Sequence, residues 1–487
     1  MNVPHFDLPE KNLTFLATKE KRYTYHDLYI YAEKLREQMS DLHPSEKTPL
    51  FLIADSTDET VLVIASAFLL KIPIFPLHPE TTRYELKEVL NQIEPSAVYA
   101  PGLKESGPLK TYPFLDFDEE NKSSSEYSDL TDFQYDAPDK LAGYFLTSGS
   151  TGTPKIVPIK RRQVFWGAES ASKNIRPATN KFWLLCLPLN HVGGINVIYR
   201  SILYHSAVYL VRSFDADNIR ALLNENKSFE AASMVPTMLE SLLEHSFFRV
   251  QFDFKGLLLG GGPISMELIN KSLTRGIPIV TSYGMTETCA QIAANSMLRP
   301  SGMYTPKQSV GRVFEPNQIE VRSENRQPLP YNEPGYIWLK GPQVFDGYLD
   351  ENLHSDYFDN EGWFNTGDIG HLNRKKQLFI ENRRSDLIIT GGENVNPVEI
   401  ENLLNGMESI KESAVVGVPD KKWGQKVIAF IVTKDEQTDF ELIEKTLRNS
   451  VRSFKIPKEF ILMNALPKTE THKIKKSELL RLYQKNS

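Results

Sequence analysis

The chain has 487 residues, 40% of them hydrophobic, and its 56 Lys and Arg against 62 Asp and Glu give a net charge of −6. A prior of roughly 150 residues per domain suggests about three structural units. The slightly acidic balance argues against nucleic-acid binding as the main function, because that needs a basic face.

Cysteine usage and apolar runs narrow the class further. Cys186 and Cys289 lie far apart in the sequence, so neither a disulfide scaffold nor a zinc site is expected. The first residues lack the basic and apolar regions of a signal peptide. The longest apolar run, residues 60–70, is far shorter than the roughly 20 residues of a membrane-spanning helix. These features predict a cytoplasmic protein without a membrane span.

Helix and strand patterns alternate in the first hundred residues. Apolar residues recur at helical spacing over residues 24–39, with Thr24 as a plausible N-cap. Further patterns predict helices at 59–70 and 84–93 and strands at 49–53, 72–76 and 97–99. Such alternation is typical of a parallel sheet with crossover helices. Residues 103–139 are polar and are predicted to be a surface excursion.

The alternation returns after residue 160 and predicts a second α/β part. Its expected helices are 161–174, 192–202, 219–226, 236–245 and 266–275, and its expected strands 182–187, 207–210, 257–259 and 278–282. Short strands between residues 310 and 380 predict a small β-subdomain. An α+β pattern then follows, with helices at 398–404 and 440–451, strands at 413–418 and 427–432, and a Lys-rich tail. The fold class is α/β, with a large N-terminal domain (1–384) and a smaller C-terminal domain (385–487).

The most distinctive stretch is residues 144–155, Tyr-Phe-Leu-Thr-Ser-Gly-Ser-Thr-Gly-Thr-Pro-Lys. Its glycines let backbone N–H groups approach an anion, its hydroxyl groups add donors, and Lys155 adds a positive charge. Such a loop can wrap a polyphosphate, although a polar surface loop is the alternative. A P-loop kinase is excluded, because its loop needs Gly-Lys-Ser/Thr after four residues and Ile156 follows Lys155 here.

Two further motifs follow apolar strands. Three glycines at 260–262 precede Pro263, and Tyr283, Thr286 and Glu287 belong to the stretch Ser-Tyr-Gly-Met-Thr-Glu. Open α/β sheets bind ligands at the carboxyl ends of their strands. A flat ring could lie against the glycines and stack on Tyr283, while Thr286 and Glu287 offer oxygen ligands suited to Mg²⁺ on a phosphate. A tight turn plus a helix cap is the alternative.

Three more residues stand out in the last quarter of the chain. Asp368, in Gly-Trp-Phe-Asn-Thr-Gly-Asp, can accept two hydrogen bonds from ribose hydroxyls or be an ordinary turn residue. Arg383 opens a stretch that leads through a strand and a double glycine into a helix. Lys473 lies in a basic loop near the C-terminus, where a solvated charge is the ordinary interpretation.

Taken together and in this order, the motifs resemble those of the adenylate-forming acyl-CoA synthetases, which include luciferases and peptide-synthetase adenylation domains. The resemblance covers residues 24–476. It implies two half-reactions, in which a carboxylate attacks the α-phosphate of ATP and a thiol then captures the acyl-adenylate. It also implies a mobile C-terminal domain that pivots at Ser385. Two departures are Ser385, where many relatives have Asp or Lys, and His472, which replaces a glycine before Lys473.

The resemblance also implies a role for each motif residue. Catalytic roles fall on Lys473, Thr286, Glu287 and His191, and Glu287 is also the expected Mg²⁺ ligand. Gly391, Gly392 and Trp423 are expected to contact coenzyme A, although Trp423 is equally well explained as a surface aromatic. ATP is expected to contact Thr147, Ser148, Gly149, Ser150, Thr151, Gly152, Lys155, Gly260, Gly261, Gly262, Pro263, Tyr283, Asp368 and Arg383. The implied cofactors are therefore ATP, Mg²⁺ and coenzyme A.

The acid substrate depends on the acyl pocket, at whose mouth His191 is expected. Residues expected to line the pocket are Gly193, Gly194, Ser233, Pro236, Thr237, Gly261, Ser282 and Gln291. The motif combination is most similar to the 2-succinylbenzoate–CoA ligases of menaquinone biosynthesis. A ligase for another aryl or fatty acid and an adenylation enzyme that loads a carrier protein stay open. A catalytically silent nucleotide-binding protein is disfavoured, because Glu287, Asp368, Arg383 and Lys473 are all present. Expected partners are small molecules only, with a homo-oligomer possible.

Overall fold

The computed structural model describes residues 4, 6, 7, 9–42, 44–101, 107–117, 137–147, 155–225, 228–262, 264–299, 309–382, 387–434, 439–467 and 474–486. Two compact units divide the chain. The first unit comprises Met1–Pro79, Gln92–Leu146 and Ile156–Asn382, and the second comprises Glu80–Asn91, Thr147–Lys155 and Arg383–Ser487. The second unit therefore combines the C-terminal part of the chain with two short segments from its first third.

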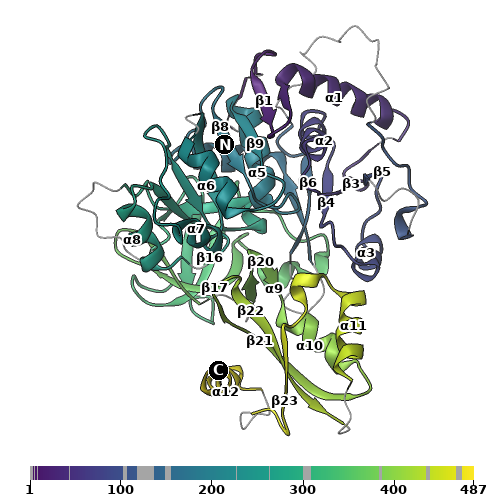
Figure 1. Cartoon of the computed structure of the whole chain (residues 1–487), viewed down its shortest axis with the longest axis vertical. Coiled ribbons are helices and arrows are strands. Elements are labelled where there is room, and N and C mark those ends of the chain that lie inside the picture. Colours follow the sequence, from purple (N-terminus) through teal and green to yellow (C-terminus); the bar gives the residue numbers. More distant parts are fainter. Residues whose placement is uncertain are drawn as a thin grey trace. The chain divides into compact units, whose positions relative to one another are not determined.

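A nine-stranded sheet, in the order β14-β13-β12-β11-β10-β8-β9-β1-β2, is the centre of the first unit (Figure 1). Its inner strands, from β12 to β1, are parallel. The strands are β1 (Thr14–Ala17), β2 (Arg22–Thr24), β8 (Phe182–Leu185), β9 (Ala207–Leu210), β10 (Phe229–Met234), β11 (Gly256–Leu259), β12 (Ile279–Met285), β13 (Ala290–Ala294) and β14 (Arg312–Val313).

Alternating side chains bury both faces of this sheet. On one face, Phe182 and Leu184 of β8 share an apolar cluster with residues of three helices, α6 (Ala216–Glu225), α7 (Pro236–Leu243) and α8 (Met266–Thr274). On the other face, Trp183 and Leu185 join the larger core, which includes α4 (Arg161–Ser172) and α5 (Val192–Tyr204). Because successive residues of a strand point to opposite faces, β8 reads as an unbroken apolar run.

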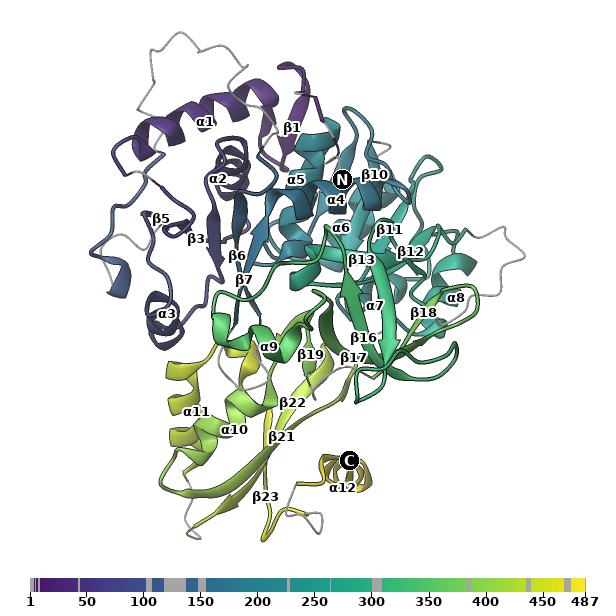
Figure 2. The same cartoon turned by 180° about the vertical axis from the view of Figure 1, so that it is seen from behind.

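A second sheet of the first unit has the order β5-β3-β4-β6-β7 (Figure 2). Its strands are β3 (Leu50–Ile53), β4 (Ile74–Leu77), β5 (Ala97–Tyr99), β6 (Leu141–Thr147) and β7 (Lys155–Lys160). Two helices accompany it, α1 (Tyr25–Met39) and α2 (Asp58–Leu69). Thr24 caps α1, since its side chain accepts the Asp27 N–H while the Asp27 carboxylate accepts the Thr24 N–H. The predicted helix and its N-cap are confirmed.

The small β-subdomain is an antiparallel sheet of four strands that belongs to the first unit. It consists of β15 (Gln318–Arg322), β16 (Gly335–Lys340), β17 (Phe364–Leu372) and β18 (Leu378–Asn382), in that order. The short helix α9 (His354–Tyr357) precedes β17. Strand β17 was not expected from the sequence, where its Gly-Asp pair suggested a turn.

The second unit contains the helix α3 (Arg83–Leu90) and the C-terminal α+β elements. Its sheet has the order β20-β19-β22-β21, with β23 parallel to β22. The elements are β19 (Ile388–Thr390), β20 (Glu393–Val395), α10 (Pro397–Asn405), β21 (Ile410–Asp420), β22 (Gly424–Thr433), α11 (Phe440–Ser450), β23 (Glu459–Leu462) and α12 (Lys476–Asn486). The Lys-rich tail therefore includes a helix, α12, whose Leu479 is fully buried. The predicted α/β fold class is confirmed.

Candidate active site

The glycine motif lies where three parallel strands end. Gly260 directly follows β11, and its N–H donates to the carbonyl of Met234 at the end of β10. A Cβ on Gly260 would lie 2.8 Å from Ser282 Oγ, and Gly261 has a φ of +75°. The backbone therefore needs glycine here, both to bring β11 and β12 close and to turn. The sequence placed this motif correctly at the carboxyl edge of the sheet.

Tyr283 and Asp368 meet although they are 85 residues apart. The Tyr283 hydroxyl donates to Asp368 Oδ2 at 2.7 Å, and both side chains are buried. Tyr283 lies within β12, not after it as the motif suggested, and Asp368 lies within β17. This hydrogen bond ties the nine-stranded sheet to the β-subdomain and orients the Asp368 carboxylate. The predicted adenine-side and ribose-side residues are thus neighbours.

Glu287 follows the end of β12 in the 3-10 helix η3 (Thr286–Thr288). Its carboxylate is 9% exposed, and Oε1 accepts a hydrogen bond of 2.7 Å from the Tyr348 hydroxyl. The Glu287 carbonyl also accepts the Phe345 N–H. Tyr348 was not singled out from the sequence, because nothing local connects it to a carboxylate 61 residues earlier.

The turn that carries Glu287 is sterically demanding. A Cβ on Gly284 would lie 1.9 Å from the carbonyl oxygen of Ala290, on the neighbouring strand β13. Cys289 and Ala290 have φ values of 50° and 76°, which residues other than glycine rarely adopt. Such a turn keeps Thr286 and Glu287 at a fixed place next to the strand edge.

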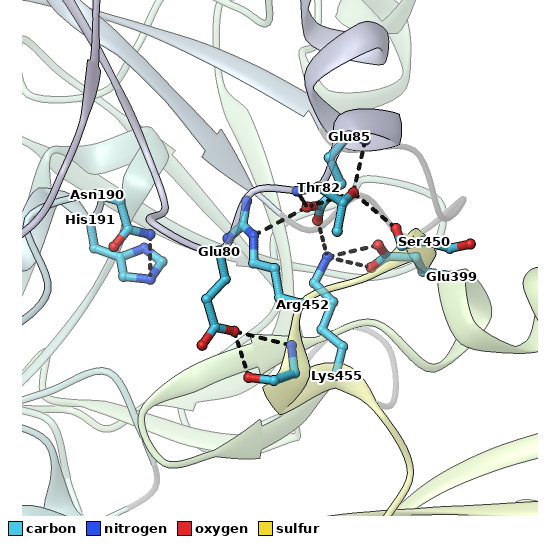
Figure 3. Close-up of polar contacts among 10 residues, drawn as sticks. Glu80, Thr82, Glu85, Asn190, His191, Glu399, Ser450, Arg452 and Lys455 are labelled. Carbon is cyan, nitrogen blue, oxygen red and sulfur yellow. Dashed lines mark hydrogen bonds and ion pairs between the residues drawn. The ribbon is translucent and has the colours of Figure 1, made fainter. Parts of the chain in front are cut away.

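His191 is the N-cap residue of α5, at the end of the connection from β8. Its Nε2 lies 3.3 Å from Nδ2 of Asn190 (Figure 3). Asn190 is 7% exposed, while His191 is half-buried. The side chain of Asn190 was not recognised from the sequence as part of the site.

Arg200, in the middle of α5, is a buried cation that the sequence analysis also missed. Its Nε donates to the Asn196 carbonyl, and its guanidinium lies 4.3 Å from the centroid of the Trp183 ring. Within the described part of the chain it forms no ion pair with an acidic side chain. Burial lowers the pKa of Arg200 to about 10, so the group is still charged at neutral pH.

Two neighbouring side chains connect Arg200 to the carboxyl ends of the parallel strands. The Trp183 indole donates to Ser233 Oγ at 3.0 Å, and Ser233 belongs to the end of β10. Asn196, one turn before Arg200, donates to the Cys289 carbonyl at 3.1 Å, directly after η3. A lone arginine among Ile, Val, Tyr and Leu residues of a helix was the signal that could have revealed this residue.

Several predicted residues lie outside the described part of the chain. These are Ser148, Gly149, Ser150, Thr151, Gly152, Pro263, Arg383 and Lys473, as well as the expected pivot Ser385. The flanks of the phosphate-loop stretch are described. Thr147 ends β6, and Lys155, 9% exposed, begins the neighbouring strand β7.

In the second unit, Gly391 and Trp423 are brought together. The Gly391 N–H donates to the Trp423 carbonyl at 2.8 Å, and a Cβ on Gly391 would lie 3.0 Å from the indole ring. Trp423 is 38% exposed, with the Lys422 ammonium 4.8 Å from its ring centroid. Gly391 and Trp423, two of the residues expected to contact coenzyme A, therefore form one exposed aromatic and cationic patch together with Lys422.

A buried cluster of charges also lies in the second unit. Glu85 of α3 pairs with Lys455 at 3.0 Å and with Arg452 at 3.4 Å, while Lys455 also pairs with Glu399 at 2.7 Å (Figure 3). Glu85 at the same time accepts the Thr82 N–H in the capping box of α3. One carboxylate thus both caps a helix and binds a cation 370 residues away in sequence.

The remaining observations concern thiols, metals and membranes. Both cysteines are free and buried, and burial raises the pKa of each thiol to about 12, so neither is a thiolate nucleophile at neutral pH. No group of three or more His, Cys, Asp and Glu side chains that could hold a metal ion occurs among the described residues. Among the helices of the described ranges, none is long and apolar enough to cross a membrane.

The fold, with its motif residues at the carboxyl ends of parallel strands, is typical of one class of protein. This class comprises the α/β enzymes that bind their ligands at that end of the sheet. The chain belongs to the AMP-binding enzyme family, whose model matches residues 9–349. The model of the AMP-binding enzyme C-terminal domain matches residues 399–473. The predicted superfamily is confirmed.

Two curated relatives share most of the chain. A 2-succinylbenzoate–CoA ligase of Listeria monocytogenes is 35% identical over 76% of this chain and 78% of its own length. The 2-succinylbenzoate–CoA ligase of Staphylococcus epidermidis is 31% identical over 96% and 94%.

Solved structures agree with this assignment. A double mutant of the o-succinylbenzoate CoA synthetase from Bacillus subtilis, bound to a product analogue, matches with a TM-score of 0.86 and 28% identity over 96% of this chain and 95% of that one. The structure of the Bacillus subtilis enzyme in complex with ATP and magnesium matches with a TM-score of 0.69 and 28% identity over 96% and 97%. The resemblance to 2-succinylbenzoate–CoA ligases found in the sequence is confirmed.

Proposed function

We propose that this protein is an ATP-dependent acid–CoA ligase that converts 2-succinylbenzoate to its CoA thioester. In the first step a carboxylate oxygen attacks the α-phosphorus of ATP, and pyrophosphate leaves. In the second step the sulfur of coenzyme A attacks the acyl carbon, AMP leaves, and the thiol proton passes to solvent. Neither step requires a nucleophile from the protein, which agrees with the two buried, protonated cysteines.

The residues of the strand edge fit ATP and Mg²⁺. Mg²⁺ is usually bound by one or two carboxylates together with substrate phosphates and water. A single oriented carboxylate, Glu287, held by Tyr348, matches that requirement. Mg²⁺ would neutralise the negative charge that otherwise repels an attacking carboxylate. Asp368, to which Tyr283 donates a hydrogen bond, would accept hydrogen bonds from the ribose hydroxyls.

The observation that carries the choice of acid is Arg200. 2-Succinylbenzoate has two carboxylates, of which only one is activated, so the second needs a counter-charge in the pocket. A buried guanidinium without an acidic partner among the described residues is costly unless an anion binds it. Fatty acids and benzoate have no second carboxylate. We therefore assign the carboxylate on the aromatic ring of the acid to Arg200.

The test compares two acids in wild type and in Arg200→Met, using pyrophosphate release with ATP and coenzyme A. The acids are 2-succinylbenzoate and 4-oxo-4-phenylbutanoate, which lacks the ring carboxylate. A hydrogen-bonded charge pair of about 1.5–3 kcal/mol predicts that wild type prefers the diacid by about 10- to 100-fold in kcat/KM. Arg200→Met should lose this preference by lowering the diacid value alone.

A second buried arginine provides the matched control. Arg161 is 1% exposed and lies 4.4 Å from the Phe68 ring, so Arg161→Met tests the loss of a buried cation elsewhere in the same unit. It should keep the acid preference. Equal use of both acids by wild type would refute the proposed substrate. A preference that survives in Arg200→Met would refute only the role of Arg200.

The cytoplasmic location and a homo-oligomer stay predictions.

A further inference from the structure

Asn190 lies in the short connection from β8 to α5, directly before His191 (Figure 3). Its side chain is more than nine-tenths buried, and its Nδ2 lies 3.3 Å from Nε2 of His191. Its other polar atom, Oδ1, is buried without a hydrogen-bond partner in the part of the chain that the structure describes. A buried carbonyl oxygen without a partner costs about 1–3 kcal/mol, so this arrangement calls for an explanation.

The backbone around His191 leaves little freedom. The His191 carbonyl accepts the N–H groups of Gly194 and Ile195 at 3.1 and 3.2 Å, which starts the helix α5. A Cβ on Gly194 would lie 2.3 Å from the Pro188 carbonyl oxygen, so the connection is packed tightly against itself. The freedom left to His191 is therefore the orientation of its ring and the position of its proton.

The amide of Asn190 can control both the orientation of the His191 ring and the position of its proton. When Nδ2 donates to Nε2, that ring nitrogen must be unprotonated, so a neutral imidazole carries its proton on Nδ1. When Nε2 carries the proton, a half-turn of the amide lets Oδ1 accept it, which gives Oδ1 the partner that it lacks in the first orientation. An amide side chain can do this because it has a donor and an acceptor on two atoms that exchange places by a half-turn.

We propose that Asn190 is a positioning residue that orients the imidazole of His191 and selects which ring nitrogen carries the proton. This inference rests on the proposed function, in which His191 lies at the mouth of the acyl pocket. A fixed ring with one defined donor presents a constant surface to the acid, so Asn190 acts on the acid and not on ATP. When Nε2 carries the proton, the Asn190 amide exchanges this orientation for the one in which Oδ1 accepts a hydrogen bond from Nε2.

The direct test is ¹⁵N NMR of the full chain with ¹⁵N-labelled histidine, measured at pH 8 without substrate. His191→Gln identifies the two ring resonances of His191 among those of the 10 histidines. In wild type, Nε2 should resonate as an unprotonated nitrogen. In Asn190→Asp, whose side chain can only accept, Nε2 should resonate as a protonated nitrogen. In Asn190→Leu the Nε2 resonance should move away from its wild-type position, because the donor that keeps this nitrogen unprotonated is removed.

The control is Asn196→Leu, a buried asparagine on α5 that bonds to Val192 and Cys289 but not to His191. Its His191 resonances should equal those of wild type. Unchanged His191 shifts in both Asn190 variants would overturn the proposal. Asn190→Asp keeps the shape of the side chain, so a result is available even where the leucine variant does not fold.

Kinetics give a second readout. Asn190→Leu should lower kcat/KM for the acid about tenfold, the worth of one hydrogen bond, with the KM for ATP unchanged. An equal rise of both KM values would indicate a merely structural role and contradict the proposal. The NMR result does not depend on the acid substrate. A wrong choice of 2-succinylbenzoate would therefore leave the tautomer shift intact and abolish only the kinetic effect.

Discussion

At the residue scale, hydrogen bonds from tyrosine hydroxyls help to orient the two carboxylates of the site. Tyr348 holds Glu287, and Tyr283 holds Asp368, each at 2.7 Å. A hydrogen bond to a charged group contributes about 1.5–3 kcal/mol, enough to choose one orientation of a side chain over its rotamers. The tyrosine rings are fixed in turn by packing, as Tyr348 contacts Phe345 and Tyr357 edge-on.

We predict that Tyr348→Phe weakens the response to Mg²⁺. Without the hydroxyl, Glu287 loses one of the groups that orient its carboxylate, so the Mg²⁺ concentration that gives half-maximal rate should rise by about tenfold, equivalent to about 1.4 kcal/mol. Titration of pyrophosphate release with Mg²⁺ at saturating ATP measures this. Tyr23→Phe is the matched control, because its hydroxyl donates to Asp58 at 2.6 Å in the same unit. A similar shift in both variants would mean that Tyr348 has no particular role at Glu287.

At the scale of secondary-structure elements, hairpins and turns determine where the site residues lie. The turn between β19 and β20 has two residues, Gly391 and Gly392, with φ values of 59° and 86°, and Thr390 pairs with Glu393 across it. Two positive φ values in a two-residue hairpin are those of a type I′ turn, which favours glycine. Here the tight turn also brings Gly391 against the Trp423 indole.

We predict that Gly391→Val impairs thioester formation more than adenylate formation. The valine would strain a positive φ and displace Trp423, so the exposed aromatic patch expected to contact coenzyme A would change shape. The KM for coenzyme A should rise about tenfold or more, a cost of roughly one to two kcal/mol. Acid-dependent exchange of pyrophosphate into ATP should continue.

The control for this change is Gly406→Val in the same unit. A Cβ there would meet only ordinary contacts of 3.4 Å or more, and Trp423 is not among them. It should leave the KM for coenzyme A unaltered. Normal turnover of Gly391→Val at limiting coenzyme A would exclude this turn from the thiol site.

Elements were easier to predict than partners. The helix α1 with its Thr24 cap and the glycine motif after β11 follow from local patterns, and both are found. Strands β10 and β17 were missed, since small alanines and a Gly-Asp pair weaken the alternation. Arg200, Tyr348 and Asn190 were missed for another reason. Their value depends on which side chains the fold places opposite them, and no spacing in the sequence encodes that.

At the scale of the whole molecule, the charge cluster connects the most distant parts of the sequence. Burial alone would raise the pKa of Glu85, but Lys455 and Arg452 outweigh it and hold the pKa of that carboxyl below its usual range. Burial does raise the pKa of Glu399, which Lys455 only partly offsets. The two carboxylates therefore differ in their surroundings. Glu85 also has Arg452 and the Thr82 N–H, whereas Glu399 has the closer contact with Lys455, at 2.7 Å.

The two glutamates should consequently contribute to stability with opposite dependence on pH. The stabilisation from Glu85 is present above its unfolded pKa and is lost as the pH falls through its lowered folded pKa. Ionisation of Glu399 costs stability as the pH rises through its raised folded pKa. Since glutamine mimics a protonated glutamate, Glu85→Gln should cost about 3 kcal/mol at pH 7, whereas Glu399→Gln should equal or exceed wild type in stability at that pH.

Thermal unfolding between pH 4 and pH 8 measures both variants against wild type. The deficit of Glu85→Gln should be present at pH 7 and shrink as the pH falls through the lowered pKa of Glu85, whereas Glu399→Gln should lose its gain over wild type as the pH falls through the raised pKa of Glu399. Equal deficits with the same pH dependence would contradict the opposite shifts of the two carboxyl pKa values. Arg448→Gln, which removes an exposed pair with Glu444 on α11, is the control and should change little.

The composition of the second unit also bears on how the polypeptide can be cut. A fragment that begins at residue 387 would lack Glu80, Thr82 and Glu85, so of its two described carboxylate partners Lys455 would keep Glu399. Conversely, a backbone break between residues 92 and 382 would leave the segment Glu80–Asn91 on the N-terminal piece. The carboxylates of this segment would still pair with cations on the C-terminal piece. Proteolytic nicking of this protein is therefore not equivalent to separation of its parts.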